Sequence, residues 1–246
     1  MREGERSGSR SVSHKMVFLF WNRPSPHQQS ACLKQAGDFN YDSKYRCLTS
    51  SPSDCNPNSA SSSPPLPSSS LSELRHGSNR DGFVVNRARV LLGSGLQTYQ
   101  QGKRALQAWN RHFGLDWAFV DPSSPVEVGE RFCVCVKELV PWAVLPLQIV
   151  YVNDHDAVKD GSLKRGLTAS FAFGSGTLRG HLLAGEERFS VELDEDNKVW
   201  YEIFSISKPA HLLSFVGYPY VRFRQKYFAQ QSMDALVRHV HSQERA

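Results

Sequence analysis

The stretch FGSGTLRGHLLAGEERF, residues 173–189, holds the side chains best suited to chemistry. His181, Glu186, Glu187 and Arg188 lie within eight residues and could supply an acid, a base and a cation. If Glu187 and Arg188 lie in one strand, they point to opposite faces. No serine nucleophile elbow, HExxH motif or Asp/His pair at a working spacing accompanies them. We therefore predict no catalytic residue and no enzyme, the alternative being an enzyme that uses His181 or Glu187.

The glycines of this stretch raise the question of a phosphate-binding loop. A P-loop needs GxxxxGK[ST] between a strand and a helix, and GSGTLRGH lacks the lysine and continues into further strand. GxGxxG also fails, because the position that needs its third glycine is Arg179. We predict instead that Gly174, Gly176, Gly180 and Gly185 serve turns, bulges and close backbone approach in a bent sheet.

The cysteines and acidic residues do not form a metal-binding pattern. The five cysteines contain no CxxC pair, and their odd number argues against a disulfide scaffold. Cys133 and Cys135 are two apart on an expected strand, so both should be buried on one face as small hydrophobic residues. NDHD, residues 153–156, is expected to be a solvated turn. The sequence predicts no metal and no cofactor.

Length and charge narrow the classes of partner. The chain has 246 residues, a net charge of +5 and a pI near 9.0, without a block of five like charges. Its basic residues are dispersed, so we predict no nucleic-acid partner. An anionic membrane surface remains compatible with this charge. No stretch reaches the roughly 18 apolar residues of a membrane helix, and the start of the chain has no apolar signal region.

Composition divides the chain into four parts. Residues 1–15 are expected to be a disordered extension, and residues 16–46 an N-terminal helix with a docking segment, FNYDSKYR. Residues 47–80 are rich in Ser, Pro and Asn and are predicted to be a disordered linker, because they bury too little apolar surface. Residues 81–246 are the main domain.

The main domain alternates between helical and strand-like patterns. An extended segment over 83–93 precedes a helix over 94–112, and residues 22–36 form a short helix with Ser25 as its cap. The strands are expected at residues 117–121, 126–139, 145–154, 167–174, 177–185, 187–194 and 198–207. Ser207 and Pro209 are expected to start another helix that stops at Gly217, before a long C-terminal helix.

This order predicts an α+β fold. A curved antiparallel sheet of six to seven strands would wrap around the long C-terminal helix, in a helix-grip-like architecture with an additional N-terminal helix. The alternative is a membrane β-barrel-like fold, which would need roughly 8 or more strands. One chain would then have difficulty closing a pore, whereas a homo-oligomer could.

Several strands are apolar on both faces, as in KVWYEIFSIS and RFCVCVK. Such a sheet could cover a helix and line an apolar pocket, face lipid, or lie in a subunit contact. The residues predicted to line a ligand pocket are Trp117, Trp142, Tyr151, Phe171, His181, Glu187, Trp200 and Tyr201.

Several longer motifs resemble a known family. MVFLFWNRPSP, FNYDSKYR, GFVVNRARVLLGSG, HFGLDWAFVD, FCVCVKE, GSGTLRGHLLAGEERF and SKPAHLLSFVGYPYVRFRQKYF look like the plant branch of uncharacterised protein family 0548, which is shared with bacteria. The match covers residues 16–46 and 81–242. Residues 1–15 and the long linker around 47–79, with Cys47 where the family tends to have glycine, depart from the family pattern.

The resemblance implies a function that the residues themselves do not indicate. Plant members include an ion channel of the chloroplast outer envelope, so it implies a cation-permeable, membrane-associated channel protein at that location. The alternative is a soluble, cytoplasmic helix-grip domain that binds an apolar small molecule or lipid. The family offers no catalytic residues to carry over.

Overall fold

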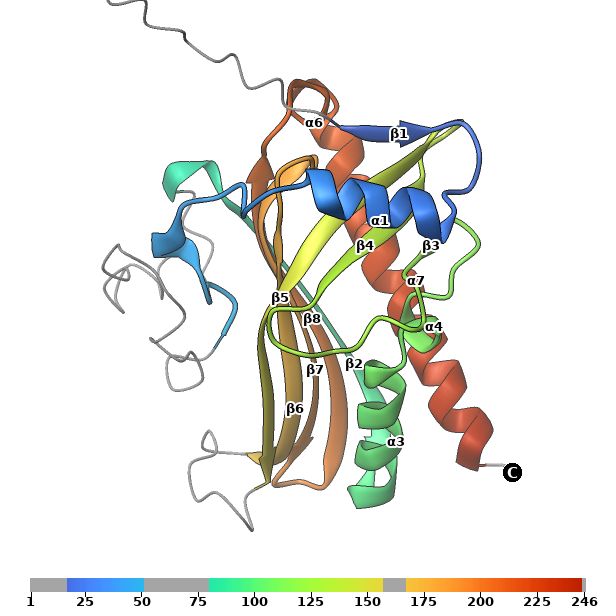
Figure 1. Ribbon diagram of the computed structural model, residues 1–246. Helices are drawn as coiled ribbons and strands as arrows, with labels where there is room; N and C mark the ends of the chain where they lie inside the picture. Colours follow the sequence, from blue (N-terminus) through green and yellow to red (C-terminus); the bar gives the residue numbers. More distant parts are fainter. Residues whose placement is uncertain (1–16, 51–79, 157–166, 245–246) are drawn as a thin grey trace, which may run out of the picture.

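The computed structural model describes residues 17–50, 80–156 and 167–244. The expectations for residues 1–15 and for most of the linker, residues 51–79, lie outside the described residues. A curved antiparallel sheet forms the centre of the described part, and a long C-terminal helix crosses its concave face (Figure 1). This arrangement is the α+β helix-grip fold that the order of elements predicted.

The sheet is a meander extended at one edge. Its strands are β1 (Phe18–Phe20), β2 (Val84–Ser94), β3 (Ala118–Phe119), β4 (Arg131–Lys137), β5 (Trp142–Asp156), β6 (Leu167–Thr177), β7 (Leu183–Asp194) and β8 (Lys198–Pro209). The order β2-β8-β7-β6-β5-β4-β3 is an open path, and the short β1 pairs with β5 beside it. Strands β4 to β8 are neighbours in both sequence and space, as expected for hairpin connections.

Helices lie on both faces of the sheet. They are α1 (Pro26–Gln35), α3 (Gly95–Gln107), α4 (Trp109–His112), α6 (Leu212–Val216) and α7 (Tyr218–Glu244), with short 3-10 turns at Ser43–Tyr45 and Arg80–Gly82. The predicted cap of α1 is confirmed: Ser25 and Gln28 bond to each other's backbone N–H in a capping box, and Pro26 begins the helix. The helix expected over 94–112 is divided at Ala108, which has an extended conformation.

Several predicted boundaries were wrong. Residues 153–156, expected as a solvated turn, are the end of β5, where they pair with β6, and the strand expected from residue 126 begins only at Arg131. Residues 177–185 do not form a strand, because residues 178–182 make the turn between β6 and β7, where Gly180 has a φ of 97°. Ser207 and Pro209 do not start a helix either. They stay in β8, where Ser207 pairs with Gly185 and Pro209 with Leu183. The helix starts at His211, whose ring accepts a hydrogen bond from the N–H of Leu213.

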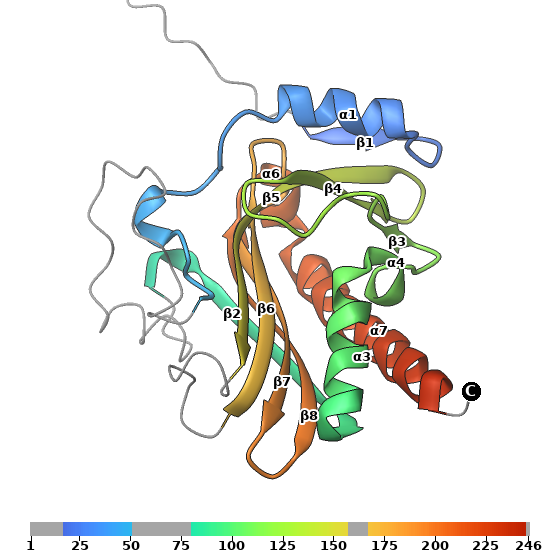
Figure 2. The same cartoon turned by 60° about the horizontal axis from the view of Figure 1, so that its bottom comes forward.

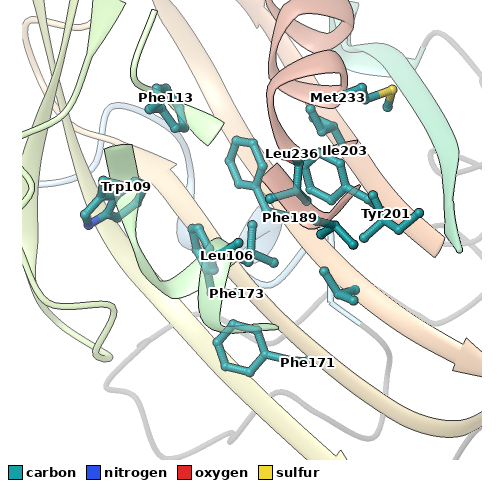
Figure 3. Close-up of a cluster of buried hydrophobic side chains, with 14 of the residues drawn as sticks. Leu106, Trp109, Phe113, Phe171, Phe173, Phe189, Tyr201, Ile203, Met233 and Leu236 are labelled. Carbon is teal, nitrogen blue, oxygen red and sulfur yellow. The ribbon is translucent and has the colours of Figure 1, made fainter. Parts of the chain in front are cut away.

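An aromatic core fills the space between the sheet and the helices (Figure 3). Phe173 and Phe189, which are cross-strand partners, stack with ring centroids 5.3 Å apart. Leu236 of α7 and Trp109 of α4 are almost completely buried above them. Each such side chain stabilises the fold by about 1.5–3 kcal/mol, so this cluster fixes α7 on the concave face.

The convex face is covered by the N-terminal segments (Figure 2). Helix α1 packs on β4 and β5, where Cys133 and Cys135 lie buried with free thiols, as the spacing predicted. Residues 39–50 run over β6 and β7. Residues 47–50, which the sequence placed at the start of the linker, are therefore part of the packed structure.

The glycine prediction is confirmed for this sheet. A Cβ atom on Gly174 would lie 2.3 Å from the ring of Tyr151, and one on Gly176 would lie 2.2 Å from the hydroxyl of Tyr41. Gly180 and Gly185 have φ angles of 97° and 149°, which favour glycine. No phosphate-binding loop is formed, since β6 continues through Gly174 and Gly176.

We predict that Gly174→Ala destabilises the protein by about 1–3 kcal/mol, because the added methyl group forces Tyr151 away from the sheet. Urea denaturation would measure the change. In a Tyr151→Ala background the same substitution should cost much less, since the ring that it meets is absent. Equal costs in both backgrounds would show that this ring does not determine the need for glycine.

Candidate functional site

A cavity of about 360 Å³ lies between the concave face of the sheet and the N-terminal half of α7. The aromatic core closes one end of it, where Phe113, Phe189 and Phe228 meet. Its walls are mainly apolar side chains of β4, β5 and α7, namely Phe132, Val134, Val136, Leu145, Leu147, Val221 and Phe228. This volume and lining are typical of sites for small molecules.

The opposite end of the cavity reaches the surface. Leu19 and Leu213 line the cavity and are also exposed. Further exposed apolar side chains lie on α6, on the start of α7 and on the turn between β4 and β5; we call this set the apolar rim. Its members are Leu19, Leu139, Val140, Leu212, Leu213, Phe215, Val216 and Phe223. The entrance of the cavity at Leu19 and Leu213 is therefore apolar.

A short polar row crosses the concave face inside the cavity. Glu187 of β7 is the cross-strand partner of Ser175 on β6 and of Ser205 on β8, and all three line the cavity. Because residues directly opposite each other in a sheet have Cβ atoms roughly 5 Å apart, the three side chains form one row. On one side of the row, Phe173, Phe189 and Ile203 begin the aromatic core.

Glu187 has no partner within the described part of the chain, where neither a hydrogen bond nor an ion pair reaches its carboxyl group. Burial raises its pKa to about 7. The hydroxyl groups of Ser175 and Ser205 likewise bond to no described residue. The neighbouring Tyr201 is not a partner of Glu187 either, because its hydroxyl forms a 2.9 Å hydrogen bond with the hydroxyl of Ser232. The row is therefore a set of polar groups that a bound molecule could satisfy.

Glu186, next in the chain, has the opposite environment. Its Oε1 accepts hydrogen bonds of 2.8 Å from the Tyr41 hydroxyl and the Cys47 N–H, and its Oε2 accepts from the N–H and the hydroxyl of Thr49. Burial raises its pKa to about 7, although these donors oppose the rise. Because adjacent residues of a strand face opposite sides, Glu186 fastens residues 41–49 to the convex face while Glu187 faces the cavity.

His181 lies at the edge of the cavity, in the turn before β7. Its Nδ1 is 2.9 Å from the N–H of Leu183 and 3.0 Å from its carbonyl oxygen, so the backbone of that one residue holds the ring. Burial lowers the pKa of His181 to about 4, and the imidazole is therefore neutral near pH 7.

An ion pair closes the cavity wall near the mouth. The Nε of Arg224 lies 3.2 Å from Glu138, which also accepts a 2.6 Å hydrogen bond from Tyr220. The guanidinium group lies 3.8 Å from the ring centroid of Trp117. Arg224 and Glu138 thus compensate each other's charge and join α7 to the end of β4.

The structure brings three of the eight predicted pocket residues to the cavity: Trp117, His181 and Glu187. The other five lie outside its lining. Phe171 and Tyr201 are in the aromatic core, Trp142 packs near α1 on the convex face, Tyr151 bonds to Thr49 on that face, and Trp200 bonds to Asp194 at 2.8 Å. Their aromatic character reflects packing on the two faces of the sheet.

Sequence reasoning missed Ser175, Ser205 and Arg224. One signal was available for the two serines. On each of the strands β6, β7 and β8 the polar residue lies two positions from a buried apolar residue on the same face, as Glu187 lies two positions from Phe189. Arg224 gave no signal, because its partner Glu138 is distant in sequence.

Residues 17–50, 80–156 and 167–244 contain neither a metal-binding cluster nor a membrane-spanning helix. No three His, Cys, Asp or Glu side chains of these ranges gather where they could hold a metal ion. None of the helices there has the length and apolar character needed to cross a membrane.

The chain is similar to a protein family, to individual relatives and to solved structures. A family profile described as "Domain of unknown function (DUF1990)" matches residues 69–235. A UPF0548 protein of Arabidopsis thaliana is 52% identical, covering 92% of this chain and 100% of the relative, and a UPF0548 protein of Dictyostelium discoideum is 34% identical over 65% and 74%. Among solved structures, a norcoclaurine synthase of Thalictrum flavum is 10% identical, with a TM-score of 0.44 over 66% of this chain and 96% of that one.

We predict that Glu187→Gln makes the protein more stable at pH 8. The pKa of Glu187 is raised from 4.5 to about 7 in the folded state, so the folded protein binds this proton more tightly than the unfolded chain does. The free energy of unfolding therefore falls as pH rises between those values. The amide of the variant cannot ionise, so the variant avoids this loss. The difference in free energy of unfolding between variant and parent should therefore be about 2 kcal/mol more favourable to the variant at pH 8 than at pH 5.

Urea denaturation at both pH values would measure this advantage. The matched control is Glu195→Gln on the exposed turn between β7 and β8, which should show no such pH dependence. Parallel stability curves for the parent and Glu187→Gln would mean that the Glu187 carboxyl is well hydrated.

Proposed function

The chain belongs to the UPF0548 family, whose matching domain is described as DUF1990, and for this member we propose a role in binding an apolar small molecule or lipid. The observation that carries the proposal is the cavity of about 360 Å³ under α7. Its walls are mainly apolar, and the polar row of Ser175, Glu187 and Ser205 crosses its floor. Protein interiors are otherwise close-packed, so a space of this size beside a well-packed aromatic core is a feature that needs an occupant.

The fold supplies the rigidity that such a site requires. The floor belongs to the central strands β6 to β8, which are paired on both sides. One end of the cavity rests on the stacked rings of Phe173 and Phe189, and the opposite wall is α7, whose Leu236 and Val240 are fully buried. A ligand would therefore enter a preformed site, which limits the ordering cost of binding.

We predict that Ser205→Phe abolishes binding of a neutral apolar fluorophore, N-phenyl-1-naphthylamine. The ring would occupy the floor of the cavity, and the affinity should fall by about tenfold or more. Fluorescence titration of the full chain would measure this loss, and urea denaturation would show that the variant is folded. Ser242→Phe, at an exposed position on the last turns of α7, is the matched control and should bind the fluorophore as the parent does.

A second role, contact with an anionic lipid surface, is favoured by the apolar rim. The rim is unusually apolar for a protein surface, with Phe215 72% exposed and Leu139 85% exposed. Residues 203–233, which include α6 and the start of α7, contain four Lys or Arg residues and no Asp or Glu. Exposed apolar side chains among cations suit the interface of an anionic bilayer. The rim also surrounds the mouth of the cavity, through which a lipid could enter.

We predict that the double substitution Leu212→Ser, Phe215→Ser lowers binding to vesicles of phosphatidylcholine and phosphatidylglycerol by about tenfold or more, because two apolar contacts with the bilayer are lost. Co-sedimentation would measure it. Val128→Ser is the control, since Val128 is also exposed but lies outside the rim. Equal binding by parent and double variant would exclude the rim as the lipid contact.

Cation conduction and a chloroplast outer-envelope location, both implied by the resemblance, stay predictions. They rest on the family resemblance and not on the geometry of the described residues. Planar-bilayer recording with the full chain tests the first, and the position of a fluorescent fusion in plant cells tests the second. Unitary, cation-selective currents would require the strands to be arranged differently in lipid from the sheet described above.

A further inference from the structure

We propose that the molecule taken by this cavity carries a protonated amine, and that its ammonium group pairs with Glu187 between the hydroxyls of Ser175 and Ser205. The inference rests on the proposed ligand-binding function and deepens it by naming the chemical class of the ligand. The rest of the ligand would be apolar and would lie against β4, β5 and α7.

The polar row matches an ammonium group in number and type. An alkylammonium has three N–H donors and no acceptor. Glu187 offers carboxylate oxygens, and Ser175 and Ser205 offer hydroxyl oxygens on the two neighbouring strands. All three groups are without a partner among the described residues, so an ammonium paired with Glu187 would have a hydroxyl acceptor on the strand at either side. The aromatic core beside the row leaves the apolar part of the ligand to extend the other way, toward the mouth.

The charges around the cavity also favour a cation. Arg224 is paired with Glu138, and His181 is neutral, so neither offers Glu187 a positive charge. Glu186 lies on the opposite face and is bonded to residues 41–49. Of the described groups that line the cavity, Glu187 is thus left with an uncompensated carboxylate. An unpaired carboxylate in an apolar site is unfavourable, and a ligand cation removes that cost.

Other head groups fit the row less well. A carboxylate ligand would place a second negative charge beside Glu187, which costs free energy in a site of low dielectric. An alcohol could share one hydrogen bond with the row but would leave the charge of Glu187 uncompensated. We therefore expect the order amine, then alcohol, then carboxylate among ligands with the same hydrocarbon chain.

Isothermal titration calorimetry of the full chain at pH 8 with octylamine, 1-octanol and octanoate tests this order. Octylamine should bind about tenfold or more tightly than 1-octanol, because a charge-assisted pair is added. Glu187→Gln should remove that advantage, so that this variant binds octylamine and 1-octanol with affinities within about threefold of each other. Glu195→Gln, on the exposed turn, should bind all three as the parent does.

Lowering the pH to 5.5 gives a second readout. Protonation of Glu187 should then compete with octylamine, weakening its binding to the parent by about tenfold, whereas Glu187→Gln should show little change. The other titratable groups that face the cavity are Glu138, His181, Tyr220 and Arg224. Glu138 and Arg224 pair with each other. Burial lowers the pKa of His181 to about 4 and raises the pKa of Tyr220, so these two groups keep one charge state across this range. Tyr201, which interacts with Glu187 from β8, also has its pKa raised by burial and stays protonated.

The outcomes separate the two proposals. If 1-octanol and octylamine bind with equal affinity, and Glu187→Gln changes neither, the amine inference is overturned and the apolar site stands. Octanoate binding more tightly than octylamine would also overturn it. If none of the three ligands binds the folded protein, the ligand-binding function itself fails.

Discussion

The architecture depends on strands that are buried on both faces. In β7, one set of alternate side chains faces the aromatic core and the cavity, and the other faces the N-terminal segment. Every polar side chain of such a strand must find a partner or raise the free energy of the fold. Glu186 and Glu187 are adjacent and of the same type, yet only Glu186 is satisfied from within the described chain. The contrast between them separates a structural carboxyl group from one available to a ligand.

Curvature of the sheet creates the space that Glu187 faces. Gly174 and Gly176 let Tyr151 and Tyr41 approach the convex face closely, and a bulge in β5 brings Tyr151 opposite Gly174. Helix α7 closes the concave side, and Leu236 joins Phe173 and Phe189 in the aromatic core. Toward the start of α7 the sheet presents serines in place of aromatic rings, and the cavity remains. The same strands therefore supply a packed core at one end and the wall of a cavity at the other.

The apolar rim links this site to the surface. Its exposed side chains come from α6, α7, β1 and the turn after β4, and two of them, Leu19 and Leu213, also line the cavity. The proposed ligand site and the proposed lipid contact therefore share the side chains of Leu19 and Leu213.

The sequence by itself determined the class of the fold and most of its elements. The order of helical and strand-like patterns and the cap formed by Ser25 with Pro26 are local signals, and local hydrogen bonding and sterics decide them. It also placed Glu187 and His181 among the pocket residues. Tertiary structure decided which aromatic residues line the cavity, because a two-sided strand does not indicate which face meets α7. Only the register across β6, β7 and β8 joins Ser175, Glu187 and Ser205 into a row, since cross-strand neighbours are set by pairing rather than by sequence distance.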